Sequence, residues 1–180
     1  GGGIITTDHV ATIDRSTISG NSAAGNGGGI YASETTYVTN STIYANSANF
    51  NGGGIYSIGI TSIHNTTIAH NEADADADGT GDGGGVYNVN STTFNIRYSV
   101  LAGNNLSGAP IYSDCTGAVG IFGNNRLGTA VGCAVAAGSS GAVYLVHSLN
   151  ELGDLRDNGG PTRTVALKPP SNMIDGGVVD

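Results

Sequence analysis

The stretch Gly27-Gly28-Gly29-Ile30 returns 25 residues later as Gly52-Gly53-Gly54-Ile55. The same phrase starts at Gly1 and at Gly83, and a degraded copy follows as Gly108-Ala109-Pro110-Ile111-Tyr112. A second phrase keeps the same spacing and reads Ser16-Thr17-Ile18, Ser41-Thr42-Ile43 and Thr66-Thr67-Ile68, each with an asparagine three residues after the isoleucine. Two markers that share one period of this length are typical of a solenoid.

The composition excludes a helical solenoid. The 180 residues include 31 glycines and only 11% charged residues, and each glycine inside a helix would cost about 1 kcal/mol. Between the glycines lie short β-branched runs such as Thr35-Thr36-Tyr37-Val38-Thr39, which predict strands of about five residues. Each 25-residue unit therefore has room for three strands and three turns.

A unit that repeats one strand per face predicts an all-β parallel β-helix of roughly five to six coils, with neighbouring strands about 4.8 Å apart. Three aliphatic rows are expected to point inward. They are Ile13, Val38, Ile63 and Ile96; Ile18, Ile43, Ile68 and Leu101; and Ile30, Ile55, Val86 and Ile111. The rows would supply a continuous core that no single repeat could bury alone.

The chain is expected to form one β-helix over residues 1–150, regular to about residue 113 and looser from 114 to 150. Residues 151–180 hold too few apolar side chains for a core of their own. We therefore expect this segment to pack along or over the end of the β-helix, and not to form an independent domain.

The net charge of −8, with six basic residues, argues against nucleic acid or an anionic membrane surface as the partner. No apolar run approaches the roughly 20 residues that a membrane-spanning helix needs, so direct membrane insertion is not expected.

Cys115 and Cys133 are the only cysteines and lie 18 residues apart. We expect a disulfide, which would stabilise the fold by about 3 kcal/mol and indicate an oxidising, extracellular setting. The alternative is a pair of buried thiols. The spacing does not match the Cys-x-x-Cys pairs of zinc or redox sites.

An acidic insertion before Gly83 carries the sharpest local pattern. Asp74, Asp76, Asp78 and Asp82, with Gly79, follow the Asp-x-Asp-x-Asp-Gly-x-x-Asp spacing of calcium loops. Gly85 stands where such loops place a bidentate glutamate. The hypothesis is a Ca²⁺ site, and the alternative is a solvated acidic bulge.

Two further ladders are expected on the coils. Strand alternation places Tyr31, Tyr56, Tyr87 and Tyr112 outward as a row, either as a platform for sugar rings or another chain, or as side chains that only stack on one another. Asparagine side chains are expected to hydrogen-bond up the stack at Asn21, Asn46, Asn71 and Asn104. Glycosylation sequons occur at Asn40, Asn65, Asn90 and Asn105.

The C-terminal stretch from Leu152 to Leu167, which contains Asn158-Gly159-Gly160-Pro161-Thr162, resembles the C-terminal motif of bacterial surface proteins with choice-of-anchor Q domains. The resemblance continues in Ser171-Asn172-Met173-Ile174-Asp175-Gly176-Gly177. The Gly-Gly-Gly-Ile-Tyr repeats are similar to those of the same proteins and of polymorphic outer-membrane proteins. The resemblance implies a right-handed parallel β-helix at the cell surface or secreted, and no catalytic residue. Val165 departs from the family pattern, which has histidine there.

The sequence therefore predicts a non-catalytic, extracellular structural or adhesive module whose partners are other surface proteins, glycans or copies of itself. One alternative is a subunit that assembles end to end into a fibre through its open strand edges. Another is a carbohydrate-binding module or a polysaccharide lyase or hydrolase, which would need clustered carboxylates beside a basic residue. Asp8, Asp14, Glu34 and Asp114 are spread along the chain, and no cofactor other than Ca²⁺ is suggested.

Overall fold

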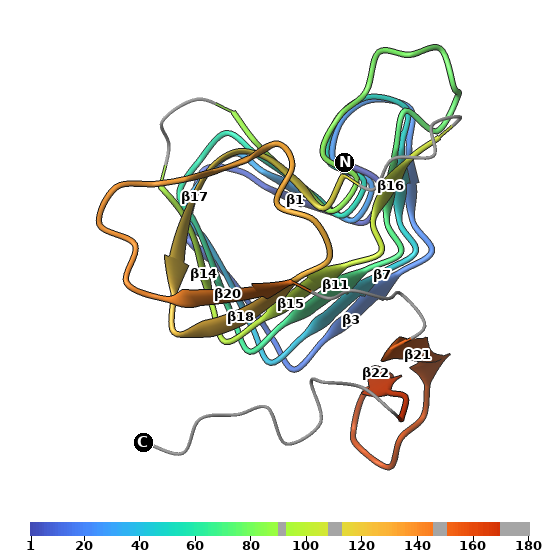
Figure 1. The fold of residues 1–180 in the computed structure, drawn as a ribbon. Helices are drawn as coiled ribbons and strands as arrows, with labels where there is room; N and C mark the ends of the chain where they lie inside the picture. The colour runs from blue at the N-terminus through green and yellow to red at the C-terminus, as the bar shows by residue number, and fades with distance from the viewer. Residues whose placement is uncertain (90–92, 108–112, 146–150, 170–180) are drawn as a thin grey trace.

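The computed structural model describes residues 1–89, 93–107, 113–145 and 151–169. Over these residues the chain winds into stacked coils of short strands with no α-helix, and all strand pairs except one are parallel (Figure 1). The fold is the predicted parallel β-helix.

Each regular coil has four strands, one more than predicted. The first coil contains β1 (Ile4–Thr6), β2 (Ala11–Asp14), β3 (Thr17–Ser19) and β4 (Ser22–Ala23). The second and third repeat them as β5 (Ile30–Ala32), β6 (Thr36–Thr39), β7 (Thr42–Tyr44), β8 (Ser47–Ala48), β9 (Ile55–Ser57), β10 (Thr61–His64), β11 (Thr67–Ala69) and β12 (Glu72–Ala73). The extra strand of each coil has only two residues, too few to give a run that the sequence pattern would reveal.

The fourth coil contains β13 (Val86–Asn88), β14 (Phe94–Arg97), β15 (Val100–Ala102) and β16 (Asn105–Leu106). The later coils are less regular and contain β17 (Cys115–Phe122), β18 (Asn124–Leu127), β19 (Cys133–Val135) and β20 (Ala142–Leu145). Because β17 pairs with both β13 and β14, it joins two faces of the β-helix into one ten-stranded sheet.

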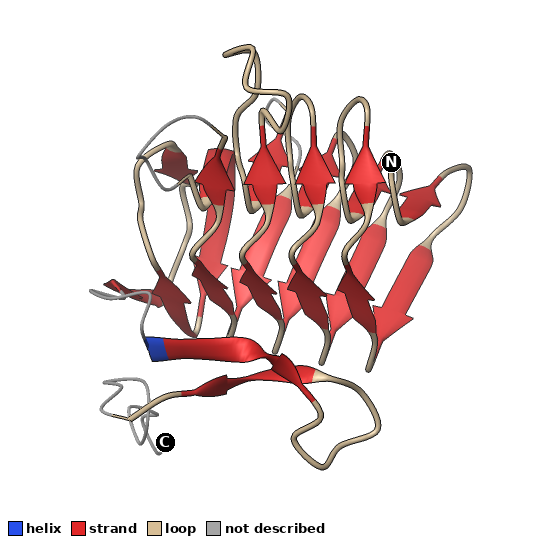
Figure 2. Ribbon diagram, turned by 90° about the vertical axis from the view of Figure 1, so that its right-hand side faces the viewer, coloured by secondary structure: helices blue, strands red, loops and turns tan. Residues whose placement is uncertain are grey.

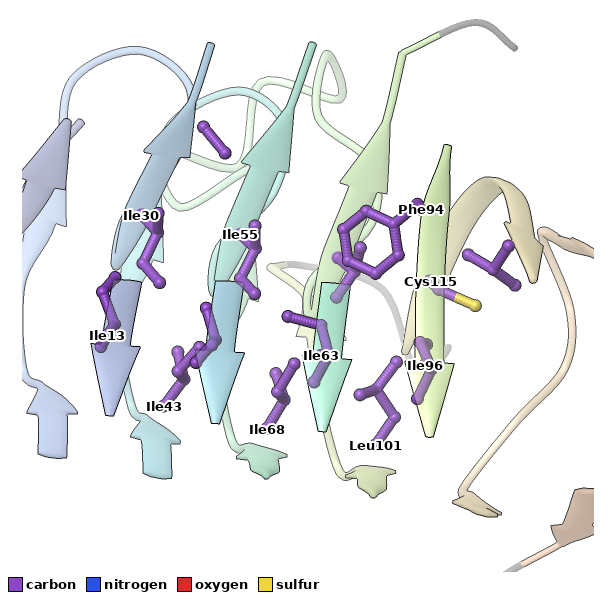
Figure 3. Close-up of a cluster of buried hydrophobic side chains, with 14 of the residues drawn as sticks. Ile13, Ile30, Ile43, Ile55, Ile63, Ile68, Phe94, Ile96, Leu101 and Cys115 are labelled. Carbon is purple, nitrogen blue, oxygen red and sulfur yellow. The ribbon is translucent and has the colours of Figure 1, made fainter. Parts of the chain in front are cut away.

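The core is made of aliphatic rows that run along the β-helix (Figure 3). The strand register confirms the first two predicted rows in full, with Ile13, Val38, Ile63 and Ile96 in one and Ile18, Ile43, Ile68 and Leu101 in the other. In the inner coils these side chains are essentially inaccessible to solvent. Burial of each such side chain contributes about 2 kcal/mol, so the rows are the main source of stability.

The third row is correct as far as Val86 and then departs from the prediction. Val86 pairs with Cys115, where the repeat spacing predicted Ile111, which lies outside the described residues. The backbone amide of Val86 donates to the carbonyl of Asp114, and the amide of Gly85 donates to that of Ser113. The next coil therefore enters this sheet later in the chain than the degraded glycine phrase suggested.

The three glycines of the repeated phrase answer three steric demands. Gly27 has a φ angle of 72°, which L side chains rarely adopt. A Cβ at Gly28 would lie 2.4 Å from the carbonyl oxygen of Gly53 in the next coil, and one at Gly29 would lie 3.1 Å from Nδ2 of Asn46. The phrase therefore marks where neighbouring coils approach too closely for any side chain.

The C-terminal segment forms an antiparallel hairpin of β21 (Leu152–Arg156) and β22 (Thr164–Leu167), which lies beside the sheet containing β3, β7 and β11 (Figures 1 and 2). Leu152 is buried against Ala69 and Ala102. Oγ1 of Thr17 also donates a hydrogen bond to the Arg163 carbonyl over 2.8 Å. The hairpin thus packs along the side of the β-helix.

Candidate functional site

A row of tyrosines lies on the outer side of the sheet formed by β5, β9 and β13. The register pairs Tyr31 with Tyr56 and Tyr56 with Tyr87. The ring centroids are 5.1 Å apart in the first pair and 5.7 Å in the second. Burial between its two neighbours raises the pKa of Tyr56. All three rings are half-buried and keep an open side.

The row begins at Tyr31, as predicted, and differs from the prediction at its other end. In the strand register Ile5, which is 56% exposed, pairs with Tyr31 from the coil before it. Thr116 pairs with Tyr87 from the coil after it. Tyr112, expected as the fourth tyrosine, lies outside the described residues. The tyrosine row therefore consists of Tyr31, Tyr56 and Tyr87, with an exposed aliphatic side chain beyond its first ring.

The acidic insertion is a loop that extends beyond the turns of the neighbouring coils (Figure 1). Asp74, Asp76 and Asp78 each have a carboxylate oxygen within 4.8 Å of the others, and the described residues form no second group of three or more such ligands. Asp74 is buried and accepts a hydrogen bond from the amide of Gly79 over 3.0 Å. The arrangement offers hard oxygen ligands of the kind that Ca²⁺ takes.

Asp82 does not join the other three aspartates. Its Oδ1 accepts hydrogen bonds from the amide of Gly83, at 2.7 Å, and from Oγ of Ser113, at 3.1 Å. The structure therefore brings together three of the four predicted ligands, and the fourth holds the loop to the next coil.

The asparagine ladder is confirmed. Nδ2 of Asn21, Asn46 and Asn71 each donates to Oδ1 of the next asparagine over 2.9 Å, and the backbone amide of each donates to the same oxygen over 3.0 Å. Asn104, the last member, donates in the same way to Asp114, at 2.8 Å from Nδ2 and 3.0 Å from the amide. A carboxylate therefore terminates the ladder.

Asp114 is fully buried and stands where the regular coils have the third glycine of the phrase. In those coils the next asparagine occupies the space above that glycine, whereas here the Asp114 side chain fills it. Burial raises the pKa of Asp114 to about 6, against the opposing hydrogen bonds from Asn104 and from the Thr129 amide. The sequence pattern shows Asp114 only as one of several carboxylates spread along the chain and does not predict its place in the ladder.

A groove of about 240 Å³ lies on the outer side of β10, β14 and β17. Its lining includes Ser62 and His64 from β10, Asn95 and Arg97 from β14, and Phe122 from β17. These positions alternate with buried ones along the strands, so the side chains face outward together. Sequence reasoning missed this group, because none of its members repeats from coil to coil.

The Arg97 guanidinium is held by aromatic rings in this groove. Its carbon lies 5.5 Å from the centroid of Phe122 and 6.0 Å from that of Tyr98, and the Tyr98 ring in turn meets His64 edge to face at 5.6 Å. Within the described part of the chain, Arg97 makes no ion pair. Its charge is therefore available to a ligand.

The carboxylate at the far end of the same row is already engaged. Asp14 accepts hydrogen bonds from Thr39, at 2.6 Å, from Arg15, at 2.8 Å, and from Asn40, at 2.9 Å. These contacts hold the pKa of Asp14 well below its usual range, and the hydrogen bond from Thr39 has the largest effect. Asp14 is therefore suited to bear a charge and not to transfer a proton near neutral pH.

Cys115 and Cys133 form the predicted disulfide, which links β17 to β19, with their Cα atoms 5.2 Å apart. The bond indicates a non-reducing environment. Of the predicted glycosylation positions, Asn40 and Asn65 are exposed, and Asn105 is half-buried with Nδ2 3.3 Å from Oε1 of Glu72. Asn90 lies outside the described residues.

No helix in residues 1–89, 93–107, 113–145 and 151–169 has the length and hydrophobicity needed to span a bilayer. Neither family models, nor curated proteins, nor solved structures match this chain.

Proposed function

We propose that this protein is a non-catalytic, extracellular module of a bacterial surface or secreted protein, and that it binds glycans or other surface proteins through side-chain rows on its flat faces. The disulfide supports an extracellular setting. The resemblance of the repeats and of residues 152–167 to choice-of-anchor Q proteins supports the surface assignment.

The tyrosine row is the observation that carries the adhesive role. The rings of Tyr31, Tyr56 and Tyr87 follow one another at intervals of one coil along the β-helix. Each ring is half-buried and contacts its neighbour in the row. Aromatic side chains with few rotatable bonds lose little entropy on binding and provide both an apolar face and a hydroxyl. Such a row suits the apolar faces and hydroxyl edges of successive sugar rings.

Substitution of Tyr56 tests this role. Tyr56→Ser removes the ring shared by both tyrosine contacts and should weaken binding to glycans recovered from an array by about tenfold or more. Phe50→Ser is the matched control, because Phe50 is an aromatic residue that is 42% exposed and lies outside the row. Equal affinities of the two variants would contradict the proposal.

Calcium binding by the acidic insertion is a separate part of the proposal. The support is the gathering of Asp74, Asp76 and Asp78 within 4.8 Å of one another. Millimolar Ca²⁺ should raise the melting temperature, chelator should reverse the rise, and Asp76→Asn should abolish it, whereas Asp157→Asn in the hairpin should not. No calcium-dependent shift in the unsubstituted protein would identify the loop as a solvated bulge.

Copies of the same chain are the second candidate partner. The strands β1, β2, β3 and β4 each lie at an outer edge of their sheets, and the core is more open there, with Ile13 9% exposed against 0% for Val38 in the next coil. An open parallel edge can pair with another chain. Sedimentation over a wide concentration range tests this: assembly that grows with concentration is expected, and a strictly monomeric particle would remove the candidate.

A further inference from the structure

The groove over β10, β14 and β17 has the composition of a ligand site and not of an ordinary solvated sheet face. Its register places Ser62, Asn95 and Gly120 in one row, and His64, Arg97 and Phe122 in the next. Hydroxyl, amide, imidazole and guanidinium groups thus converge beside one aromatic ring within about 240 Å³. Concave sites with a few convergent polar groups on a rigid frame are typical of small-ligand binding.

The side chains of Ser62, Asn95 and Arg97 have no hydrogen-bond or ion-pair partner in the described part of the chain. Three coils earlier in the row of Arg97, Asp14 accepts hydrogen bonds from three donors. The polar groups at the groove end of this face are therefore directed at solvent. At the other end the carboxylate is already hydrogen-bonded within the protein.

Gly120 shapes the floor of the groove. A Cβ there would lie 2.4 Å from Oδ1 of Asn95 and 2.9 Å from Cε2 of Phe122. Both side chains therefore lean over the space that a larger residue would occupy. The amide and the ring edge meet there, and the Phe122 ring also carries the Arg97 guanidinium at 5.5 Å.

The chemistry of the groove matches a carboxylated sugar. A planar guanidinium held on an aromatic ring binds a carboxylate through two parallel hydrogen bonds. The hydroxyl of Ser62, the amide of Asn95 and the imidazole of His64 can pair with ring hydroxyls, while Phe122 faces the apolar side of the sugar. Because the whole chain carries a net charge of −8, one acidic residue is favoured over a long polyanion.

We propose that this groove binds a single uronic acid residue of a glycan, with Arg97 holding the carboxylate and Phe122 the sugar face. The inference rests on the proposed function, since it names a glycan class for a non-catalytic surface. The groove and the tyrosine row lie on different faces, so uronic acid binding in the groove and glycan binding by the tyrosine row can each fail without the other.

Galacturonic acid and its methyl ester are the probes, because the ester keeps the ring and loses the charge. In a titration of the isotope-labelled protein followed by NMR, the acid should shift the backbone amides of Ser62, Asn95 and Arg97 and bind at least about tenfold more tightly than the ester. Equal affinities, or shifts that map to another face, would overturn the proposal.

Arg97→Gln should lower the affinity for the acid to that for the ester and leave the ester unchanged. Arg156→Gln, which removes the same charge from the exposed hairpin, should have no effect. Equal behaviour of the two variants would overturn the proposal, and if Arg97→Gln does not fold, the comparison of acid and ester on the unsubstituted protein decides. Tyr56→Ser should keep acid binding in the groove; loss of glycan binding in that variant alone supports the tyrosine row separately.

Discussion

Asn71 shows how one side chain joins successive coils. Its Oδ1 accepts from the amide and from Nδ2 of Asn46, and its own Nδ2 donates to Oδ1 of Asn104 and to the Ile43 carbonyl. All of these groups are buried. Because a buried donor without an acceptor costs free energy, the ladder helps to hold neighbouring coils together at the turn.

Asn71→Ala should therefore destabilise the protein by roughly 3 kcal/mol, since it leaves two buried donors of Asn46 without an acceptor. Asn21→Ala, at the half-buried start of the ladder, removes no acceptor from another asparagine in the described residues and should cost much less. Urea unfolding measures both. Equal losses of stability in the two variants would show that the ladder does not stabilise the protein by pairing buried donors with acceptors.

Asp114 gives the stability a distinctive pH dependence. Burial raises the pKa of Asp114 from the 3.8 of an ordinary aspartate to about 6 in the folded protein. Between these values the folded state holds a proton that the unfolded chain has lost, so the free energy of unfolding should fall by roughly 3 kcal/mol as the pH rises from about 4 to about 6, then level off.

A comparison with Asp114→Asn isolates the contribution of Asp114 to the pH dependence of stability. The variant keeps an acceptor for Asn104 and has no titrating group at this position, so other carboxylates and His70 cancel in the difference. The stability difference between the two proteins should shift in favour of the unsubstituted protein below about pH 5. A difference that is constant across this range would contradict the assigned pKa shift.

At the scale of elements, β17 holds the regular coils and the later coils together. It carries Cys115, which occupies the core row after Val86, and it pairs with β19 through Gly117, Ala118 and Val119. The disulfide to Cys133 thus joins β17, which contributes buried side chains to the core, to β19, whose side chains are largely exposed.

Serine substitutions separate the disulfide from the packing. Cys133→Ser loses the crosslink, which should cost about 3 kcal/mol for a loop of this size. Cys115→Ser loses the same crosslink and also places a hydroxyl in the aliphatic row, so it should cost about 1 to 3 kcal/mol more. Thermal unfolding without reductant measures the difference. Equal costs would show that Cys115 contributes nothing to the core.

Leu152 is the buried side chain by which the hairpin of β21 and β22 packs on the sheet, beside the half-buried Val165 and Leu167. Leu152→Ala should loosen the hairpin from the sheet, because Leu152 is the buried residue that packs on Ala69 and Ala102. Limited proteolysis should then cut the turn between the two strands faster, while the coils stay intact. Leu155→Ala, on the same strand but outside this cluster, is the control. Equal cleavage rates would contradict the docking role of Leu152.

Most of the fold could be predicted because one repeat equals one coil. The fixed offset placed Ile18, Ile43 and Ile68 in one row and also placed the asparagines. The prediction departed at Cys115, because the fifth coil lacks the glycine phrase and Asp114 replaces its third glycine. A repeat pattern carries no information about a coil that has lost it.

The candidate sites were less predictable for a related reason. The tyrosine row repeats and could be found, whereas the groove combines Ser62, Asn95, Arg97 and Phe122, which have no counterparts of the same type in other coils. Only the register brings them together. Asp82 matched the calcium spacing but is held away by Ser113, a contact that depends on the following coil.

At the scale of the whole molecule, the β-helix is a rigid core with distinct outer faces. One face bears the tyrosine row and a second the groove. A third face is partly covered by the hairpin of β21 and β22 (Figure 2). Within the described residues the only gathering of three or more acidic, histidine or cysteine ligands is in the exposed acidic insertion, away from these faces. The tyrosine row and the groove therefore lie on different faces, and each can be tested without the other.

The most direct test of this account follows binding and turnover together. The protein is incubated with neutral and acidic polysaccharides while bound material and new reducing ends are measured in the same samples. Binding should weaken in Tyr56→Ser, and no new reducing ends should appear above the buffer control. Reducing ends that accumulate in proportion to protein concentration, or the absence of any bound polysaccharide, would contradict it.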